Sequence, residues 1–140
     1  LLAAGADKEK AGNGGWSPLI HAACEGHVEI VRLLLAAGAD KDKANSYGFT
    51  PLIGAARGGR IEIVQLLLSA GADKEKADNS GETPLIYAAR GGCVVTVRLL
   101  LAAGANKNKV SSTGNTALSH ATSRDHQEIV QLLQPAGPQT

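Results

Sequence analysis

His21, Cys24 and His27 are the residues whose types and spacing come nearest to a metal site, because imidazole and thiolate are common zinc ligands. They follow one another at intervals of three residues. A fourth ligand is not evident near them, and the sequence contains no C-x-x-C motif. We therefore predict no metal site and no cofactor.

Sequence motifs for catalysis are missing as well. No glycine-rich loop precedes a lysine in the order that binds nucleotide phosphates, and neither G-x-S-x-G nor H-E-x-x-H occurs. We therefore expect a protein that is not an enzyme and has no catalytic residues. Any enzymatic activity would reside elsewhere in the parent chain.

Lysine pairs that recur along the chain suggest a third kind of chemistry, a track for nucleic-acid phosphates. The pairs are Lys8 and Lys10, Lys41 and Lys43, Lys74 and Lys76, and Lys107 and Lys109. Acidic residues lie between or beside most of these lysines, and the whole chain has a formal charge of only +1. Because neighbouring acids cancel the field of the lysines, we predict solvated, self-neutralising loops and no nucleic-acid partner.

The composition indicates which elements must position these side chains. The 140 residues suffice for one domain, and 44% of them are hydrophobic but only 3% aromatic. A core built from Ala, Leu, Ile and Val suits closely packed helices. The longest apolar run, at 33–37, is far shorter than the roughly 18 residues that a membrane span needs. We therefore expect no membrane insertion.

A repeat of 33 residues organises the chain. Residues that recur at this interval include Pro18, Pro51 and Pro84, then Ala22, Ala55, Ala88 and Ala121, then Val31, Val64, Val97 and Val130, then Gly38, Gly71, Gly104 and Gly137. We predict a single domain over 1–140. Its parts are the tail of an upstream repeat at 1–11, full repeats at 12–44, 45–77 and 78–110, and a degenerate C-terminal capping repeat at 111–140.

Local signals within a unit predict two helices and a projecting turn. Ser17 stands where a helix N-cap belongs, and Pro18 suits the first helical position. Gly26 ends this first helix. Apolar residues cover most of the circumference of the second helix, at 28–37, so we expect it to be packed between neighbours. The polar stretch at 40–48 predicts an extended turn, called a finger below.

A family resemblance is carried by the segment Gly48-Phe49-Thr50-Pro51-Leu52, followed by Ala55-Ala56, Gly59, Val64, Leu67-Leu68 and Gly71-Ala72-Asp73. The unit resembles the ankyrin repeat, over nearly the whole chain. The resemblance implies an all-α solenoid of stacked helix-turn-helix units with projecting β-turn fingers. The histidine that the family places after Pro-Leu is replaced by Ile20, Ile53 and Ile86, so we expect aliphatic packing where the family has an imidazole hydrogen bond.

The last unit departs from this pattern. Ala117 replaces the proline, Asp125 replaces a glycine, and Pro135 stands where the second helix ends in earlier units. Because the outer face of a terminal repeat meets water, we expect a capping repeat at which the array ends. Nothing comparable stands at 1–11, so we expect at least one further repeat, or a different cap, upstream.

As the resemblance implies, fingers and first helices line a concave groove that holds partners. The core has no evident use for the four aromatic rings of the chain, and such rings are frequent anchors of binding surfaces. Arginines beside them suit acidic groups on a partner. The candidate partner-binding residues are Trp16, His21, Glu25, Tyr47, Phe49, Arg57, Arg60, Glu82, Tyr87 and Arg90.

The most specific hypothesis for the function is a non-enzymatic scaffold that binds a protein, or an extended peptide with acidic groups, on its concave face. Two alternatives stay open. The chain could be a structural or assembly subunit of a larger complex, docked by an edge or by its convex side. It could also be an accessory array in cis with a missing catalytic or channel domain.

The two cysteines bear on the cellular compartment, which is otherwise unknown. Cys24 and Cys93 stand about two repeats apart, roughly 20 Å when helices pack about 10 Å from one another. A disulfide requires Cα atoms within about 7 Å. We therefore expect reduced thiols and a reducing compartment such as the cytoplasm, the nucleus or the plastid stroma.

The alanine column predicts a first stability effect. Ala88 stands where paired helices must approach closely, so Ala88→Leu should overpack the core and lower the free energy of unfolding by roughly 1–3 kcal/mol. Urea denaturation checks this value. An unchanged midpoint would contradict the proposed register of the repeats.

Overall fold

The computed structural model describes residues 13–134, which form helices and no strand. The elements are a short 3-10 helix η1 (Asn13–Gly15), α1 (Pro18–Glu25), α2 (Val28–Ala36), α3 (Pro51–Gly58), α4 (Ile61–Ser69), α5 (Pro84–Gly91), α6 (Val94–Ala102), α7 (Ala117–Ser123) and α8 (Gln127–Leu133). The expected tail at 1–11 and the expected helix break at Pro135 lie outside the described residues. Within the described part, no helix is long and apolar enough to cross a membrane.

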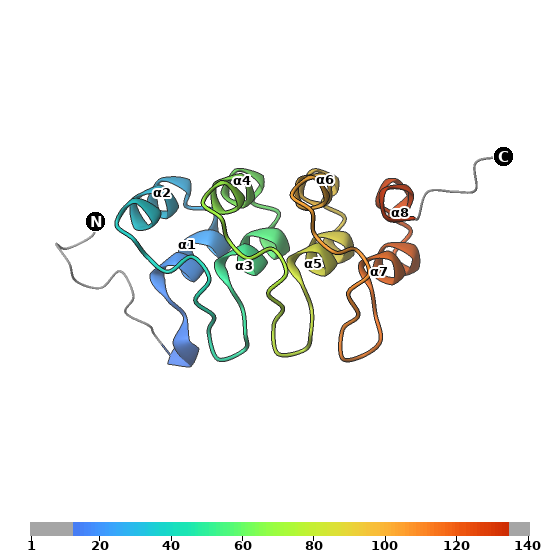
Figure 1. Cartoon of the computed structure of the whole chain (residues 1–140), viewed down its shortest axis with the longest axis horizontal. Coiled ribbons are helices and arrows are strands. Elements are labelled where there is room, and N and C mark those ends of the chain that lie inside the picture. Colours follow the sequence, from blue (N-terminus) through green and yellow to red (C-terminus); the bar gives the residue numbers. More distant parts are fainter. Residues whose placement is uncertain (1–12, 135–140) are drawn as a thin grey trace.

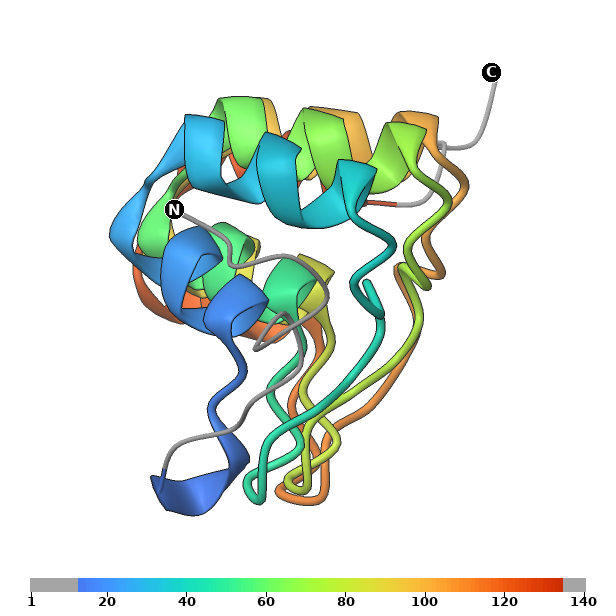
Figure 2. The same cartoon turned by 90° about the vertical axis from the view of Figure 1, so that its left-hand side faces the viewer.

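The helices stack as pairs along one axis (Figure 1). The first helices α1, α3, α5 and α7 form one layer, the second helices form another, and the fingers project away from both (Figure 2). Each first helix contacts its own second helix and the first helices of the neighbouring repeats. The main contacts therefore connect nearest neighbours, as in a solenoid.

The predicted caps begin and end the first helices. The side-chain oxygen of Thr50 accepts a hydrogen bond from the Ile53 amide at 3.1 Å, and Gly59 ends α3 with a φ of 68°. In the last repeat, the Thr116 and Ser119 side chains each bond the other residue's backbone amide, which forms a capping box at α7. Asp125 adopts a φ of 59° at the position where earlier repeats have a glycine.

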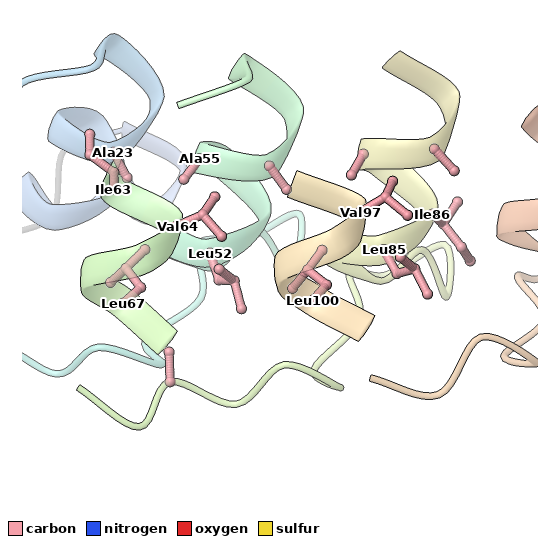
Figure 3. Packing of buried hydrophobic residues seen from close by; sticks show 14 of the residues in the cluster. Ala23, Leu52, Ala55, Ile63, Val64, Leu67, Leu85, Ile86, Val97 and Leu100 are labelled. Atoms are coloured by element: carbon pink, nitrogen blue, oxygen red, sulfur yellow. The ribbon is translucent and has the colours of Figure 1, made fainter. Parts of the chain in front are cut away.

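The core is aliphatic and continuous from repeat to repeat (Figure 3). Ala55 and Ala88 are fully buried in this core. Ile20, Ile53 and Ile86, at the position of the family's histidine, are at most 1% exposed. Aliphatic packing therefore takes the place of a polar group between these repeats.

The second helices α2 and α4 differ in how far the described residues cover their apolar side chains. Ile30 and Leu33 are 43% and 51% exposed, whereas Ile63, one repeat after Ile30, is fully buried. Ile63 is covered because α4 packs against α2, while the described residues place no helix on the other side of α2. Burial at this position therefore depends on the preceding repeat.

The fingers are joined to one another by backbone hydrogen bonds. The amides of Ser46, Asn79 and Ser112 donate to the carbonyl oxygens of Gly14, Tyr47 and Ser80 in the preceding fingers, at 2.8, 3.0 and 2.9 Å. Each bond connects the same positions of successive repeats. The fingers therefore form a ladder that fixes their spacing.

The lysine-rich loops carry a second ladder, in which acidic side chains bond to backbone. Asp42 Oδ1 accepts from the Asp73 amide at 2.8 Å, and Glu75 Oε2 accepts from the Asn106 amide at the same distance. The Lys76 ammonium donates to the Asp42 carbonyl at 2.7 Å. The acidic side chains of these loops therefore form hydrogen bonds to the next repeat, besides lying close to the positive charges of the lysines.

One buried hydroxyl in the core predicts a stabilising substitution. Thr96 is fully buried and its Oγ1 has no hydrogen-bond partner, at a position where the other repeats have isoleucine. Thr96→Val keeps the shape and removes the unsatisfied group, so it should raise the free energy of unfolding by about 1 kcal/mol. Urea denaturation measures the change. Thr96→Ser, which keeps the hydroxyl and loses a methyl group, should destabilise, and a gain of stability there would contradict the explanation.

Candidate partner-binding surface

Three aromatic side chains from successive repeats form one strip across the fingers and first helices. The ring centroids of Trp16 and Phe49 lie 6.0 Å apart, and those of Phe49 and Tyr87 are also 6.0 Å apart, both edge to face. Tyr47, at 6.1 Å from Phe49, and His21, at 5.4 Å from Trp16, flank the strip. Rings from three repeats thus make one continuous surface, which we call the aromatic strip (Trp16, Phe49 and Tyr87).

Side-chain caps in the fingers hold the backbone beneath these rings. Asn45 Oδ1 accepts hydrogen bonds from the amides of Tyr47 and Phe49, both at 2.9 Å. Asp78 Oδ1 makes the equivalent bonds to Ser80 and Glu82 in the next finger. The backbone that carries the aromatic strip is therefore fixed before any partner binds.

The expectation that the core has no use for these rings is wrong for Tyr87. Its ring packs against the core, and its hydroxyl donates to Asp78 Oδ2 at 2.6 Å. Burial, together with the hydrogen bond and the charge of Asp78, raises the pKa of Tyr87 above its usual range. Tyr87 therefore joins α5 to its own finger as well as contributing to the strip.

Glu82 and Arg90 form a two-pronged ion pair at the centre of the surface. Arg90 Nη2 and Nη1 donate to the two carboxylate oxygens at 2.8 and 3.2 Å, and the guanidinium lies 4.7 Å from the centroid of the Tyr87 ring. His120 Nε2 is 3.8 Å from Glu82. Burial and the charge of Arg90 lower the pKa of His120, which favours the uncharged imidazole.

Two further arginines line the same groove without such a partner. Phe49, Arg57, Glu82, Tyr87, Arg90, Gly91 and Arg124 surround an open groove of about 480 Å³. Arg57 lies 5.7 Å from the Phe49 ring centroid. Across residues 13–134, neither Arg57 nor Arg124 has a carboxylate within 4 Å, so the groove contains more positive than negative charge.

The remaining candidate residues differ in where they lie. His21 and Glu25 are exposed on α1, and the His21 ring lies beside Trp16 of the strip. Arg60 lies away from it, in the turn between α3 and α4, where its Nε donates to the Cys24 carbonyl at 3.1 Å. The Nε of Arg60 thus bonds the end of α1, and its place opposite acidic groups of a partner stays a prediction.

Two residues that contribute to this surface, Asp78 and Arg124, are not among the candidates predicted from the sequence. Asp78 holds a finger and the Tyr87 hydroxyl, and a signal for it existed: Asn45, Asp78 and Ser111 each stand three residues before a finger glycine. Arg124 lines the groove one position after the column of Arg57 and Arg90, so the repeat alone did not single it out.

The described residues contain no cluster of His, Cys, Asp or Glu that could hold a metal ion. Cys24 and Cys93 are free and half-buried. Burial raises the pKa of the Cys24 thiol, which disfavours the reactive thiolate.

Comparison with known proteins decides the family. A family model described as ankyrin repeats in three copies matches residues 1–78 and 70–139. This chain belongs to the ankyrin repeat family. The all-helical ankyrin solenoid predicted from the sequence is thus confirmed. Ankyrin repeats generally mediate protein–protein interactions and are typically non-catalytic, so the family supports a protein-binding scaffold. No curated protein matches the chain.

The Tyr87 hydroxyl gives a test of how this ankyrin array holds its binding surface. Tyr87→Phe leaves Asp78 Oδ2 without its 2.6 Å bond, and loss of a bond to a charged group should lower the free energy of unfolding by about 1–3 kcal/mol. Tyr47→Phe is the matched control, because the Tyr47 side chain is 60% exposed, and it should change stability by less than about 0.5 kcal/mol. Equal urea midpoints for the two variants would contradict the assigned role.

Proposed function

We propose that this ankyrin array binds an extended segment of a protein partner on the concave face formed by its fingers and first helices. The observation that carries the proposal is the aromatic strip, in which Trp16, Phe49 and Tyr87 span three repeats at 6.0 Å intervals. Rings in such an arrangement suit a chain that runs along the array. We further propose that the array acts by binding alone, without catalysis.

Pre-organisation supports this role. Each ring stands on a finger or helix that is already hydrogen-bonded, through Asn45, through Asp78 and through the ladder between fingers. Ordering a loop upon binding costs free energy, and a surface that is ordered in advance avoids most of that cost. The strip therefore combines large contact area with little loss of entropy.

Variants of the strip test the proposed face. Phe49→Ala removes the ring that contacts both neighbours, and Arg57→Ala removes the cation beside it. Because truncating an anchor commonly costs 2 kcal/mol or more, each variant should retain a natural partner at least about tenfold less well in a quantitative pull-down. Thermal unfolding followed by circular dichroism must show that both variants are folded.

Gln65→Ala is the matched control on the opposite side. Gln65 is exposed on α4, whereas Arg32 and Arg98, which share its column, each bond a glutamate of the next repeat. The control should bind like the original chain. Binding that is lost with Gln65→Ala and kept with Phe49→Ala would place the contact on the convex side and favour a structural subunit of a larger complex.

A further inference from the structure

We infer that the partner segment carries two acidic side chains about six residues apart, one for Arg57 and one for Arg124, and an uncharged residue midway between them. This inference rests on the proposed function, since it names the chemistry of the segment that would occupy the same groove. The basis is the pairing of the three arginines in the groove: Arg90 is paired with Glu82, whereas Arg57 and Arg124 are not paired with a carboxylate in the described residues.

Arg90 is not available to an incoming acid. Both of its Nη atoms donate to Glu82, whose side chain is only 13% exposed, so the pair is held out of water. A carboxylate approaching Arg90 would also approach the negative charge of Glu82, which is bonded to both Nη atoms. The centre of the groove therefore rejects an acid and accepts a neutral residue.

Arg57 and Arg124, unlike Arg90, can each bind an acidic side chain of the partner. Both line the groove, and in the described portion of the chain neither lies within 4 Å of a carboxylate. They stand at the C-terminal ends of α3 and α7, where the helix dipole offsets only about half of a unit charge. Each guanidinium thus keeps positive charge and free donors for a carboxylate.

The geometry of the solenoid sets the spacing of the two acids. Arg57 and Arg124 are separated by two repeats, and packed helices lie about 10 Å apart, which gives roughly 20 Å between the two sites. An extended peptide rises about 3.3 Å per residue, so about six residues span that distance. The flexibility of the arginine side chains widens the range to about five to seven residues.

A peptide-display selection against the complete chain tests the inference without knowledge of the natural partner. The probe is a library of random peptides of about twelve residues, long enough to span both sites. Selected peptides should carry two acids five to seven positions apart. A synthetic copy with both acids changed to their amides should bind at least about tenfold less tightly in fluorescence anisotropy, with a smaller difference at high salt.

Charge-neutralising variants assign the sites. Arg57→Gln and Arg124→Gln should each weaken the acidic peptide at least fivefold, and in the double variant the acidic and amidated peptides should bind equally. Arg98→Gln is the matched control, because it removes the same charge from the second-helix layer, where Arg98 bonds Glu128. It should bind the acidic peptide like the original chain.

The outcomes separate this inference from the proposed function. Selected peptides without an acidic pair, whose binding is lost with Phe49→Ala, would overturn the inference and leave the concave face as the binding surface. If acidic peptides bind the double variant of Arg57 and Arg124 as tightly as the original chain, and also bind Phe49→Ala equally well, the inference and the proposed function are both overturned. A selection that enriches no peptide above uncoated support would count against the inference.

Discussion

Stacking of helix pairs in register is the constraint on which the rest of this structure depends. A pair of helices of eight and nine residues, such as α3 and α4, cannot bury its apolar faces alone, so neighbouring pairs must cover them. Small residues make this possible, because a Cβ added at Gly54 of α3 would lie only 2.6 Å from the Cys24 sulfur of α1. Ile63 is fully buried because α4 packs against α2, which shows that the preceding repeat covers this position.

Stacking also organises the polar parts of the molecule. Because every repeat presents the same backbone groups at the same height, one hydrogen bond between fingers recurs from Ser46 to Ser112. The acids of the lysine-rich loops use the same regularity, with Asp42 and Glu75 each bonding an amide of the next loop. Hydrogen bonds thus join the fingers to one another although they contain no strand in the described residues.

The proposed binding surface is built from groups that also hold the array together. Tyr87 contributes a ring to the strip and joins α5 to Asp78, and Arg90 lies over that ring while it neutralises Glu82. Such double use fixes the side chains at the centre of the groove. Arg57 and Arg124 line the same groove and form no ion pair among the described residues, which is why the proposed acidic contacts fall on them.

The sequence by itself determined the repeat, its helices and the position of each ring within a repeat. Residues that recur at an interval of 33 show which positions are equivalent in successive repeats. Caps such as Thr50 and Gly59 determine where a helix begins and ends through local hydrogen bonds and backbone conformation. Only the tertiary structure decided which charges are satisfied. Arg60 binds a carbonyl of the preceding repeat and Arg90 binds Glu82, while Arg57, in the same column as Arg90, faces no acid in the part of the chain described. The reason is physical: the partner of a long charged side chain lies across space on another turn or repeat, where the periodicity of one column carries no information.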